Sequence, residues 1–258
     1  MKQAILFASF GVVNAEARTA CIDAAAAQIA AAFPAYEVRQ AYTSVFIKKK
    51  LAGQGVQVDS LPEALENLHE DGFTRVIIQP GYLTAGEEYA KKVQAVVEEF
   101  QPKFAELIIS RPLMQRQEDC QEMLTVLQAI FVLESGDELV LVGHGSPHQH
   151  NPAYENLQFL ADEAGLPVHI GVIEPTDTPD FTAVLTRLRR KRAQNILLAP
   201  LLLAGGAHVN EDIAGSEPES WLSRLQAEGF NVHTSLKGLG EYPEFQKLYV
   251  QRINELRL

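Results

Sequence analysis

Short apolar runs alternate along the chain with longer segments whose apolar positions recur every three to four residues. The short runs have the length of buried strands, and the longer segments have the period of amphipathic helices. The strands predicted in this way are 4–8, 37–40, 75–79, 106–109, 138–142, 168–172, 195–203 and 231–233. The predicted helices are 15–33, 45–51, 61–71, 87–100, 118–131, 154–164, 182–192, 218–228 and 241–256. This alternation predicts an α/β fold of parallel sheets flanked by helices.

The second half of the chain repeats the pattern of the first. Residues 4–11 (AILFASFG) align with 138–145 (ELVLVGHG), and residues 76–88 align with 196–208. Each half then has about 130 residues, which is a typical size for a compact α/β domain. We therefore expect two pseudo-symmetric lobes, 1–130 and 131–258, each a parallel sheet flanked by helices, with an active-site cleft between them.

Composition and charge exclude several classes of partner. The formal net charge of −11 argues against nucleic acid, which needs a basic surface, but it allows an anionic small molecule in a local basic pocket. No apolar stretch approaches the ~20 residues of a membrane helix, and the first apolar run is too short for a signal peptide. Two cysteines without a CxxC motif fit a reducing compartment. We expect a cytoplasmic protein.

Three metal-binding side chains follow predicted strands of the second half. His144 stands between Gly143 and Gly145 directly after a strand, Glu174 follows the next strand, and His208 follows the one after that. Ligands bind at the carboxyl ends of strands in open α/β sheets, and neighbouring strands lie ~4.8 Å apart. Two imidazoles and a carboxylate suit Co²⁺, Ni²⁺, Fe²⁺ or Zn²⁺. Glu88 aligns with His208 in the repeat and is a further acidic candidate.

Other interpretations of these residues stay open. A lone histidine after a strand is commonly a hydrogen-bonded structural residue. Ser146 does not stand in the G-x-S-x-G pattern of a hydrolase nucleophile. The chain has neither G-x-G-x-x-G nor a Walker motif, so nucleotide binding is not expected. Lys48 and Lys49 can recognise substrate carboxylates, or they can simply lie on a solvated helix face.

An ordered set of short motifs resembles the sirohydrochlorin cobalt chelatase (CbiK) family of class II tetrapyrrole chelatases. The resemblance covers the whole chain. It rests on Ser9-Phe10-Gly11, Ala41-Tyr42-Thr43-Ser44, Gly86-Glu87-Glu88-Tyr89, Gly143-His144-Gly145, Val172-Ile173-Glu174, Gly206-Ala207-His208, Asn210-Glu211-Asp212, Ser220-Trp221 and Gly238-Leu239-Gly240-Glu241. One departure is Pro175-Thr176-Asp177 after Glu174, where a Ser-Tyr-Pro-like run is expected.

The resemblance implies a site and a reaction. His144 and His208 match the metal-binding histidines, and Glu174 and Glu88 match acidic positions of the active site, with Glu174 as a third metal ligand. The implied activity is insertion of Co²⁺ into sirohydrochlorin, without nucleotide, in anaerobic cobalamin biosynthesis. We expect Ser9, Phe10, Lys48 and Lys49 to bind the tetrapyrrole.

The alternatives are a nickel or iron chelatase on a related tetrapyrrole, a non-catalytic tetrapyrrole or metal carrier, and a plain α/β protein with a structural metal. Zn²⁺ is a further metal that the three ligands would accept. A homo-oligomer is compatible with the sequence.

Overall fold

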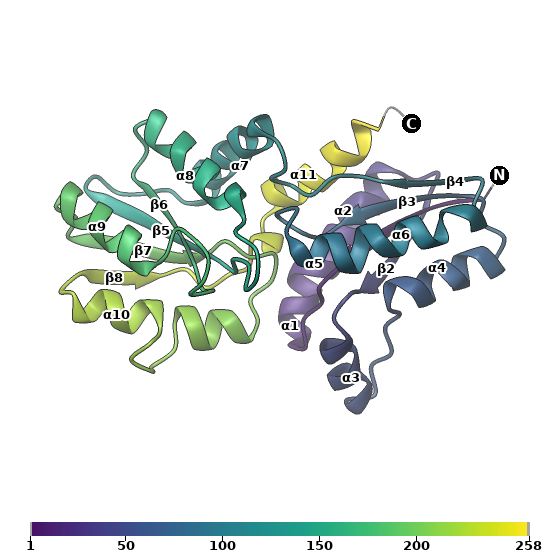
Figure 1. Cartoon of the computed structure of the whole chain (residues 1–258), viewed down its shortest axis with the longest axis horizontal. Helices are drawn as coiled ribbons and strands as arrows, with labels where there is room; N and C mark the ends of the chain where they lie inside the picture. Colours follow the sequence, from purple (N-terminus) through teal and green to yellow (C-terminus); the bar gives the residue numbers. More distant parts are fainter. Residues whose placement is uncertain (1, 257–258) are drawn as a thin grey trace. The chain divides into compact units, whose positions relative to one another are not determined.

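The computed structural model describes residues 2–256 and contains two four-stranded parallel sheets flanked by helices (Figure 1). The strands of the first sheet lie in the order β2-β1-β3-β4, and those of the second in the order β6-β5-β7-β8. Their bounds are β1 Gln3–Ser9, β2 Glu37–Tyr42, β3 Arg75–Pro80, β4 Glu106–Ile109, β5 Asp137–Gly143, β6 Val168–Val172, β7 Asn195–Pro200 and β8 Asn231–Thr234. The structure confirms the parallel α/β fold, and the strands of both sheets follow the same order, as the internal repeat predicts.

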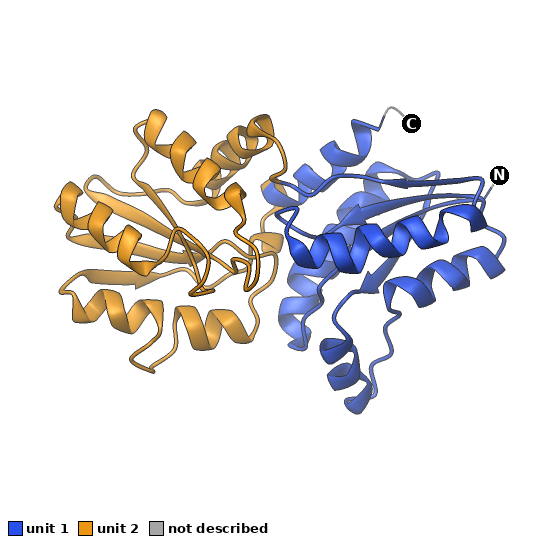
Figure 2. Ribbon diagram, viewed as in Figure 1, with its two compact units in different colours: residues 1–113, 245–258 blue, residues 114–244 orange. Residues whose placement is uncertain are grey.

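The chain divides into two compact units, whose bounds differ from the halves expected from the repeat (Figure 2). Unit 1 runs to Leu113 and resumes at Phe245, and unit 2 spans Met114–Glu244. Helix α11 (Pro243–Asn254) thus contributes most of its length to unit 1. The reason is packing over a long sequence distance: the ring of Tyr249 lies 5.0 Å from that of Phe7, and its hydroxyl donates to the carbonyl oxygen of Gly81 at 3.3 Å.

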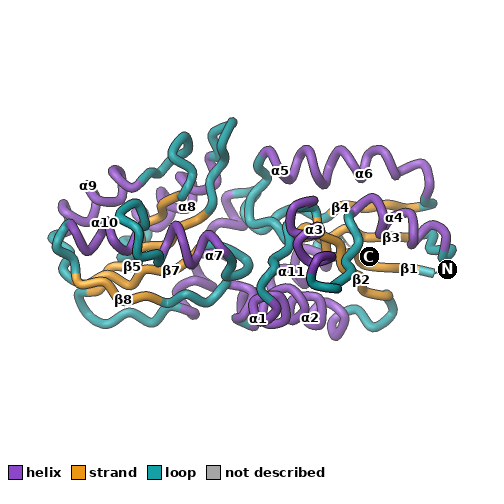
Figure 3. Tube along the Cα trace, turned by 90° about the horizontal axis from the view of Figure 1, so that it is seen from below, coloured by secondary structure: helices purple, strands orange, loops and turns teal. Residues whose placement is uncertain are grey.

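Helices cover both faces of the sheet in unit 1 (Figure 3). On one face, α4 (Leu61–Glu70) and α6 (Ala95–Phe100) pack against buried residues such as Leu6 and Val76, and on the other lie α2 (Ala24–Ala32) and α11. The elements are α1 Ala15–Ala17, η1 Arg18–Asp23, α2 Ala24–Ala32, α3 Val45–Gly53, α4 Leu61–Glu70, α5 Glu87–Tyr89, η2 Ala90–Gln94, α6 Ala95–Phe100 and η3 Gln101–Lys103. Ser60 and Glu63 form a reciprocal capping box at the start of α4, as their spacing predicts.

Unit 2 is built in the same way. Its elements are α7 Gln117–Ile130, α8 Pro152–Glu163, α9 Phe181–Lys191, η4 Val209–Ile213, α10 Trp221–Ala227 and η5 Leu239–Glu241. Helices α9 and α10 pack on Val140 and Leu198 of the sheet. Gln158 of α8 covers the edge of β6, because its amide donates to the carbonyl oxygen of Val168 and accepts from the N–H of Ile170.

Three π-helical turns in the described part of the chain are the main local difference from the predicted elements. Two of them, η1 and η2, interrupt the predicted helices 15–33 and 87–100, and the third, η4, follows β7. Strand β7 also ends at Pro200, short of the predicted 203. Single π turns widen a helix locally and are frequent at functional sites. Within residues 2–256 no helix has both the length and the apolar character needed to cross a bilayer.

Candidate metal and substrate site

His144 directly follows β5 on a turn that two glycines make possible. A β-carbon on Gly143 would lie 2.3 Å from Cε1 of Tyr154, so no side chain fits at this strand end. Gly145 has a φ of +82°, in the left-handed region that favours glycine. The turn presents the His144 side chain, 38% exposed, at the carboxyl edge of the second sheet. That edge is where open α/β sheets bind ligands.

Glu174 follows β6, the neighbour of β5, and its loop is bonded to the His144 turn. The N–H of Ile173 donates to the carbonyl oxygen of Gly143 at 2.9 Å, and the N–H of Glu174 donates to that of His144 at 3.0 Å. As a result, Oε1 of Glu174 lies 3.9 Å from Nδ1 of His144. The carboxylate and the imidazole therefore lie side by side at the ends of adjacent strands.

His208 reaches the same place from the loop after β7. Its ring centroid lies 4.7 Å from that of His144, and the two ring planes are nearly perpendicular, at 88°. His208 immediately precedes the π turn η4, and the side chain is 49% exposed. The fold thus brings together two half-exposed imidazoles that the sequence placed only on separate strand ends.

Hydrogen bonds engage one nitrogen of each imidazole. Nδ1 of His208 lies 2.7 Å from Oδ2 of Asp212, and Nδ1 of His144 lies 3.2 Å from the carbonyl oxygen of Gly145. In the described part of the chain, neither Nε2 atom has a hydrogen-bonding partner. Each ring therefore keeps Nε2 as a nitrogen that can bind a ligand.

The three predicted metal ligands are not already arranged as a closed metal cage. Among residues 2–256, no group of three or more His, Cys, Asp and Glu side chains has the arrangement of a metal site. The two imidazoles are adjacent, whereas the Glu174 carboxylate lies beside Nδ1 of His144. This is an open arrangement, in which a metal would keep exchangeable positions.

Asp177, which the sequence marked only as a departure from the family pattern, joins the two loops that carry His144 and Glu174. Its side chain is buried and accepts from the N–H groups of Ser146 at 2.8 Å, Asn151 at 3.1 Å and Thr178 at 2.9 Å. Nδ1 of His150 lies 2.8 Å from the same carboxylate. Asp177 therefore holds the loop after β5 against the loop after β6, and His150 belongs to this contact.

In unit 1, Phe10 and Glu88 are linked by a lysine that sequence reasoning missed. Lys92 forms an ion pair with Glu88, four residues earlier, and its ammonium lies 5.0 Å from the ring centroid of Phe10. Phe10 follows β1 and is 39% exposed. A helical period alone could have related Lys92 to Glu88, but not to Phe10.

The other predicted substrate-binding residues of unit 1 differ in accessibility. Ser9 is completely buried, so in this structure it supports the turn that carries Phe10 and presents no surface to a ligand. Lys48 forms an ion pair with Glu63, whose pKa falls to about 2 because of that ammonium and two hydrogen bonds from Ser60. Lys49 is exposed on α3.

The repeat places two related side-chain pairs at equivalent positions. Glu88 aligns with His208, and Lys92 then aligns with Asp212. Both pairs span four residues across a π turn after the third strand of their sheet. Their charges are reversed: an acid precedes a base in unit 1, and a base precedes an acid in unit 2. The same local geometry therefore presents different chemistry in the two units.

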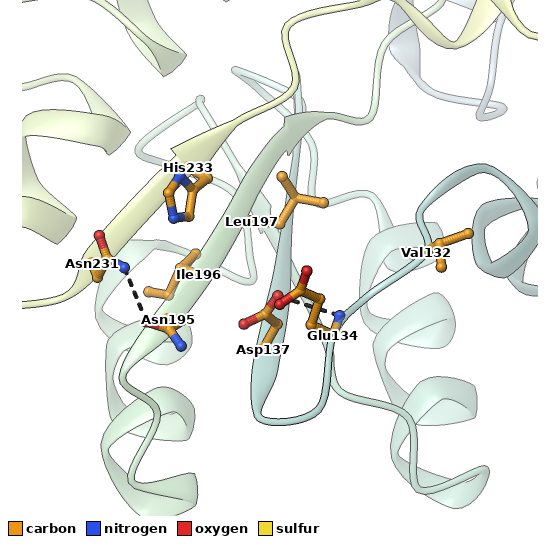
Figure 4. Close-up of a pocket in the computed structure, with 8 residues that line it drawn as sticks. All are labelled: Val132, Glu134, Asp137, Asn195, Ile196, Leu197, Asn231 and His233. Atoms are coloured by element: carbon orange, nitrogen blue, oxygen red, sulfur yellow. Dashed lines mark hydrogen bonds between the residues drawn. The ribbon is translucent and has the colours of Figure 1, made fainter.

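Other histidines and a surface hollow lie away from these groups. His169 is buried against Glu138, at 2.8 Å, and burial lowers the pKa of its imidazole. His233 lines a hollow at the amino end of the second sheet with Asn195 and Asn231, which are hydrogen-bonded to each other (Figure 4). Because His144 lies at the opposite, carboxyl end of that sheet, this hollow is not the candidate site.

Comparison with known sequences gives a consistent result. A family model described as cobalt chelatase (CbiK) matches residues 3–257. A sirohydrochlorin cobaltochelatase of Salmonella typhimurium is 30% identical over 257 residues, which cover 99% of this chain and 96% of that protein. The sirohydrochlorin cobaltochelatase CbiKC of Nitratidesulfovibrio vulgaris is 30% identical over 256 residues, covering 98% and 89%.

Solved structures support the fold. SirB from Bacillus subtilis subspecies spizizenii, in complex with cobalt, has a TM-score of 0.61 at 15% identity and covers 99% of this chain and 95% of its own. CbiX, described as the terminal enzyme of sirohaem biosynthesis in denitrifying bacteria, has a TM-score of 0.57 at 17% identity and covers 98% of each chain. The two-sheet architecture is thus the chelatase-like α/β fold.

Proposed function

Because the chain belongs to the cobalt chelatase (CbiK) family, we propose that it inserts Co²⁺ into sirohydrochlorin, the substrate named for its two relatives. The observation that carries this proposal is the perpendicular pair of imidazoles, 4.7 Å apart at a strand edge. Insertion of Co²⁺ releases the two pyrrole N–H protons, and the metal forms bonds to the macrocycle nitrogens in their place. No nucleotide takes part in this scheme.

His144 and His208 would take up the metal through Nε2. Imidazole nitrogen is a good donor for Co²⁺, and also for Ni²⁺, Fe²⁺ and Zn²⁺, so the ligand type alone does not select cobalt. Glu174 would supply an oxygen donor after a side-chain rotation away from Nδ1 of His144. Two or three protein ligands leave positions at which macrocycle nitrogens can replace water.

Removal of the pyrrole protons needs a base close to the metal. Glu174 is a group of the right kind, and an imidazole can accept a proton at Nε2 once that nitrogen has released the metal; each side chain is partly exposed. Glu88 is a further acceptor for protons in unit 1, where its ion pair with Lys92 keeps a carboxylate at the strand edge. The residues of this chain therefore supply both the donors for the metal and the acceptors for the protons.

The open metal arrangement favours transfer over storage. A structural or storage site closes around its metal with a full ligand set, whereas the described residues offer adjacent imidazoles and no preformed cage. This observation supports the proposed enzyme over a protein with a structural metal, and the number of product molecules per protein molecule separates the enzyme from a tetrapyrrole carrier. We propose that the reaction takes place in the cytoplasm, where thiols stay reduced.

The direct test is anaerobic incubation of the protein with Co²⁺ and sirohydrochlorin, followed by absorbance. We expect several molecules of product per protein molecule. His144→Ala and His208→Ala should each lower the insertion rate by about a hundredfold or more. His233→Ala, a histidine at the opposite end of the sheet, is the matched control and should not change it. A stoichiometric limit of one product, or unchanged rates in the first two variants, would refute the proposal.

A further inference from the structure

Exposed apolar side chains gather at one edge of unit 1. Phe10 follows β1 and is 39% exposed, while Val45 and Phe46 begin α3 after β2 and are 80% and 63% exposed. The N–H of Ser44 donates to the carbonyl oxygen of Phe10 at 3.3 Å, which joins the start of α3 to the turn after β1. Half of the large exposed hydrophobic side chains of residues 2–256 thus lie on the turn after β1 and on the first turn of α3, at the carboxyl edge of the sheet.

A lysine ammonium group lies over each of the two exposed aromatic rings at this edge. Nζ of Lys92 lies 5.0 Å from the ring centroid of Phe10, and Nζ of Lys50 lies 4.5 Å from that of Phe46. An ammonium over an aromatic face is held by the ring quadrupole. The edge therefore combines apolar surface with positive charge, although the protein as a whole has a net charge of −11.

Lys92 is the better anchored of the two cations. Its ion pair with Glu88 comes from the same helical segment, four residues earlier, and the side chain remains 38% exposed. A lysine ammonium has three N–H donors. Glu88 and the ring of Phe10 orient the ammonium and leave donor capacity toward solvent.

We propose that Phe10 and Lys92 form a subsite for the tetrapyrrole, in which Lys92 binds a peripheral carboxylate of the substrate and Phe10 contacts its apolar ring system. The inference rests on the proposed function for the identity of the substrate. Its physical basis is complementarity. The ligand is a flat conjugated ring system with peripheral carboxylates, and the subsite places the ammonium of Lys92 beside the aromatic ring of Phe10. Lys92 is a specificity-determining residue for carboxylated tetrapyrroles.

The chain offers close matched controls for both members of the subsite. Lys91 precedes Lys92, forms the same kind of four-residue ion pair with Glu87, and has no aromatic ring contact within residues 2–256. Phe159 on α8 of unit 2 is a phenylalanine with 58% exposure. Each subsite variant therefore has a control that removes the same group outside the subsite. Lys91→Met is the control for Lys92→Met, and Phe159→Ala is the control for Phe10→Ala.

The experiment measures anaerobic binding of metal-free sirohydrochlorin by absorbance titration. Lys92→Met should raise the Kd on the order of tenfold, because one charge-assisted hydrogen bond is lost. Added KCl should weaken sirohydrochlorin binding by the wild type more than binding by this variant. Phe10→Ala should also raise the Kd. The two controls should stay within about twofold of the wild type, and Lys92→Arg should bind nearly as well as the wild type because it keeps the charge.

Insertion kinetics separate this subsite from a merely structural role. Lys92→Met should raise the KM for sirohydrochlorin and leave kcat and the KM for Co²⁺ unchanged. Equal Kd values for the Lys92→Met and Lys91→Met proteins would overturn the subsite, and if the wild type still inserts cobalt, the proposed function stands. Binding that depends on Lys92 in a wild-type protein without turnover would uphold the subsite and refute the proposed function.

Discussion

Nδ1 of His208 lies 2.7 Å from Oδ2 of Asp212, four residues later across the π turn. An ionised carboxylate can only accept a hydrogen bond, so Nδ1 is the donor and Nε2 is left unprotonated in the neutral ring. Carboxylates in this position orient metal-binding histidines and make them better donors. Under the proposed function, Asp212 would therefore orient His208 to bind metal through Nε2.

Replacing Asp212 should weaken metal binding while the fold is retained. We expect Asp212→Asn to lower the affinity for Co²⁺ by about 10–100-fold, the usual cost of losing such a partner. Anaerobic calorimetric titration with Co²⁺ alone measures this. Glu211→Gln, at the neighbouring position of the same turn, is the control and should bind normally. Equal affinities for the two variants would contradict the role assigned to Asp212.

Asp177 should contribute both to the stability of the protein and to the geometry of the proposed metal site. Asp177→Ala leaves three backbone N–H groups without their acceptor, so we expect the free energy of unfolding to fall by about 3 kcal/mol and Co²⁺ binding to weaken. Urea unfolding and Co²⁺ titration measure the two effects. Thr176→Ala removes one exposed hydrogen bond from the same loop and should cost less than about 1 kcal/mol. A stable Asp177→Ala protein would show that the two loops are held by other contacts.

Gly143 should be irreplaceable for a steric reason. The β-carbon of Gly143→Ala would lie 2.3 Å from Cε1 of Tyr154, and we expect the displaced ring to lower the free energy of unfolding by about 1–3 kcal/mol. Gly53→Ala, at the end of α3, meets no atom within 4 Å and should be neutral or stabilising by up to about 1 kcal/mol. Thermal unfolding compares the two, and equal melting temperatures would argue against close packing at the His144 turn.

Lys48 should stabilise the fold in a pH-dependent way through Glu63. The pKa of Glu63 is lowered from 4.5 to about 2, so the ionised form is favoured in the folded protein. This contribution is present above the unfolded pKa and is lost as the pH falls from about 4.5 through about 2. Lys48→Met should raise the pKa of Glu63, as followed by NMR titration, and should be less stable than the wild type at neutral pH.

The difference in the free energy of unfolding between the wild type and Lys48→Met should shrink as the pH falls from about 4.5 to about 2. Lys49→Met serves as the control, because Lys49 is exposed on the same helix and has no ion pair within residues 2–256. A pH-independent difference would mean that Lys48 stabilises α3 by packing and not through the charge of Glu63.

Local pattern was enough to predict most of the framework. A buried parallel strand needs a continuous apolar run, and a covering helix needs an apolar stripe, so both leave a period in the sequence. The same logic put His144 and Glu174 at strand ends, where the parallel register does place them. It could not find the π turns, because one extra residue in a turn leaves no distinct period. Nor could the local pattern predict that Tyr249 packs against Phe7 and so places most of α11 in unit 1.

The sequence by itself determined the elements, their repeated order and the residue types at each strand end. Only the tertiary structure decided which of these groups meet: His208 with His144 and Asp212, Lys92 with Phe10, and Asp177 with the N–H groups of two loops. The reason is physical. Secondary structure follows from contacts between near neighbours, whereas a site depends on the rotamer and approach of side chains from distant segments, which packing alone sets.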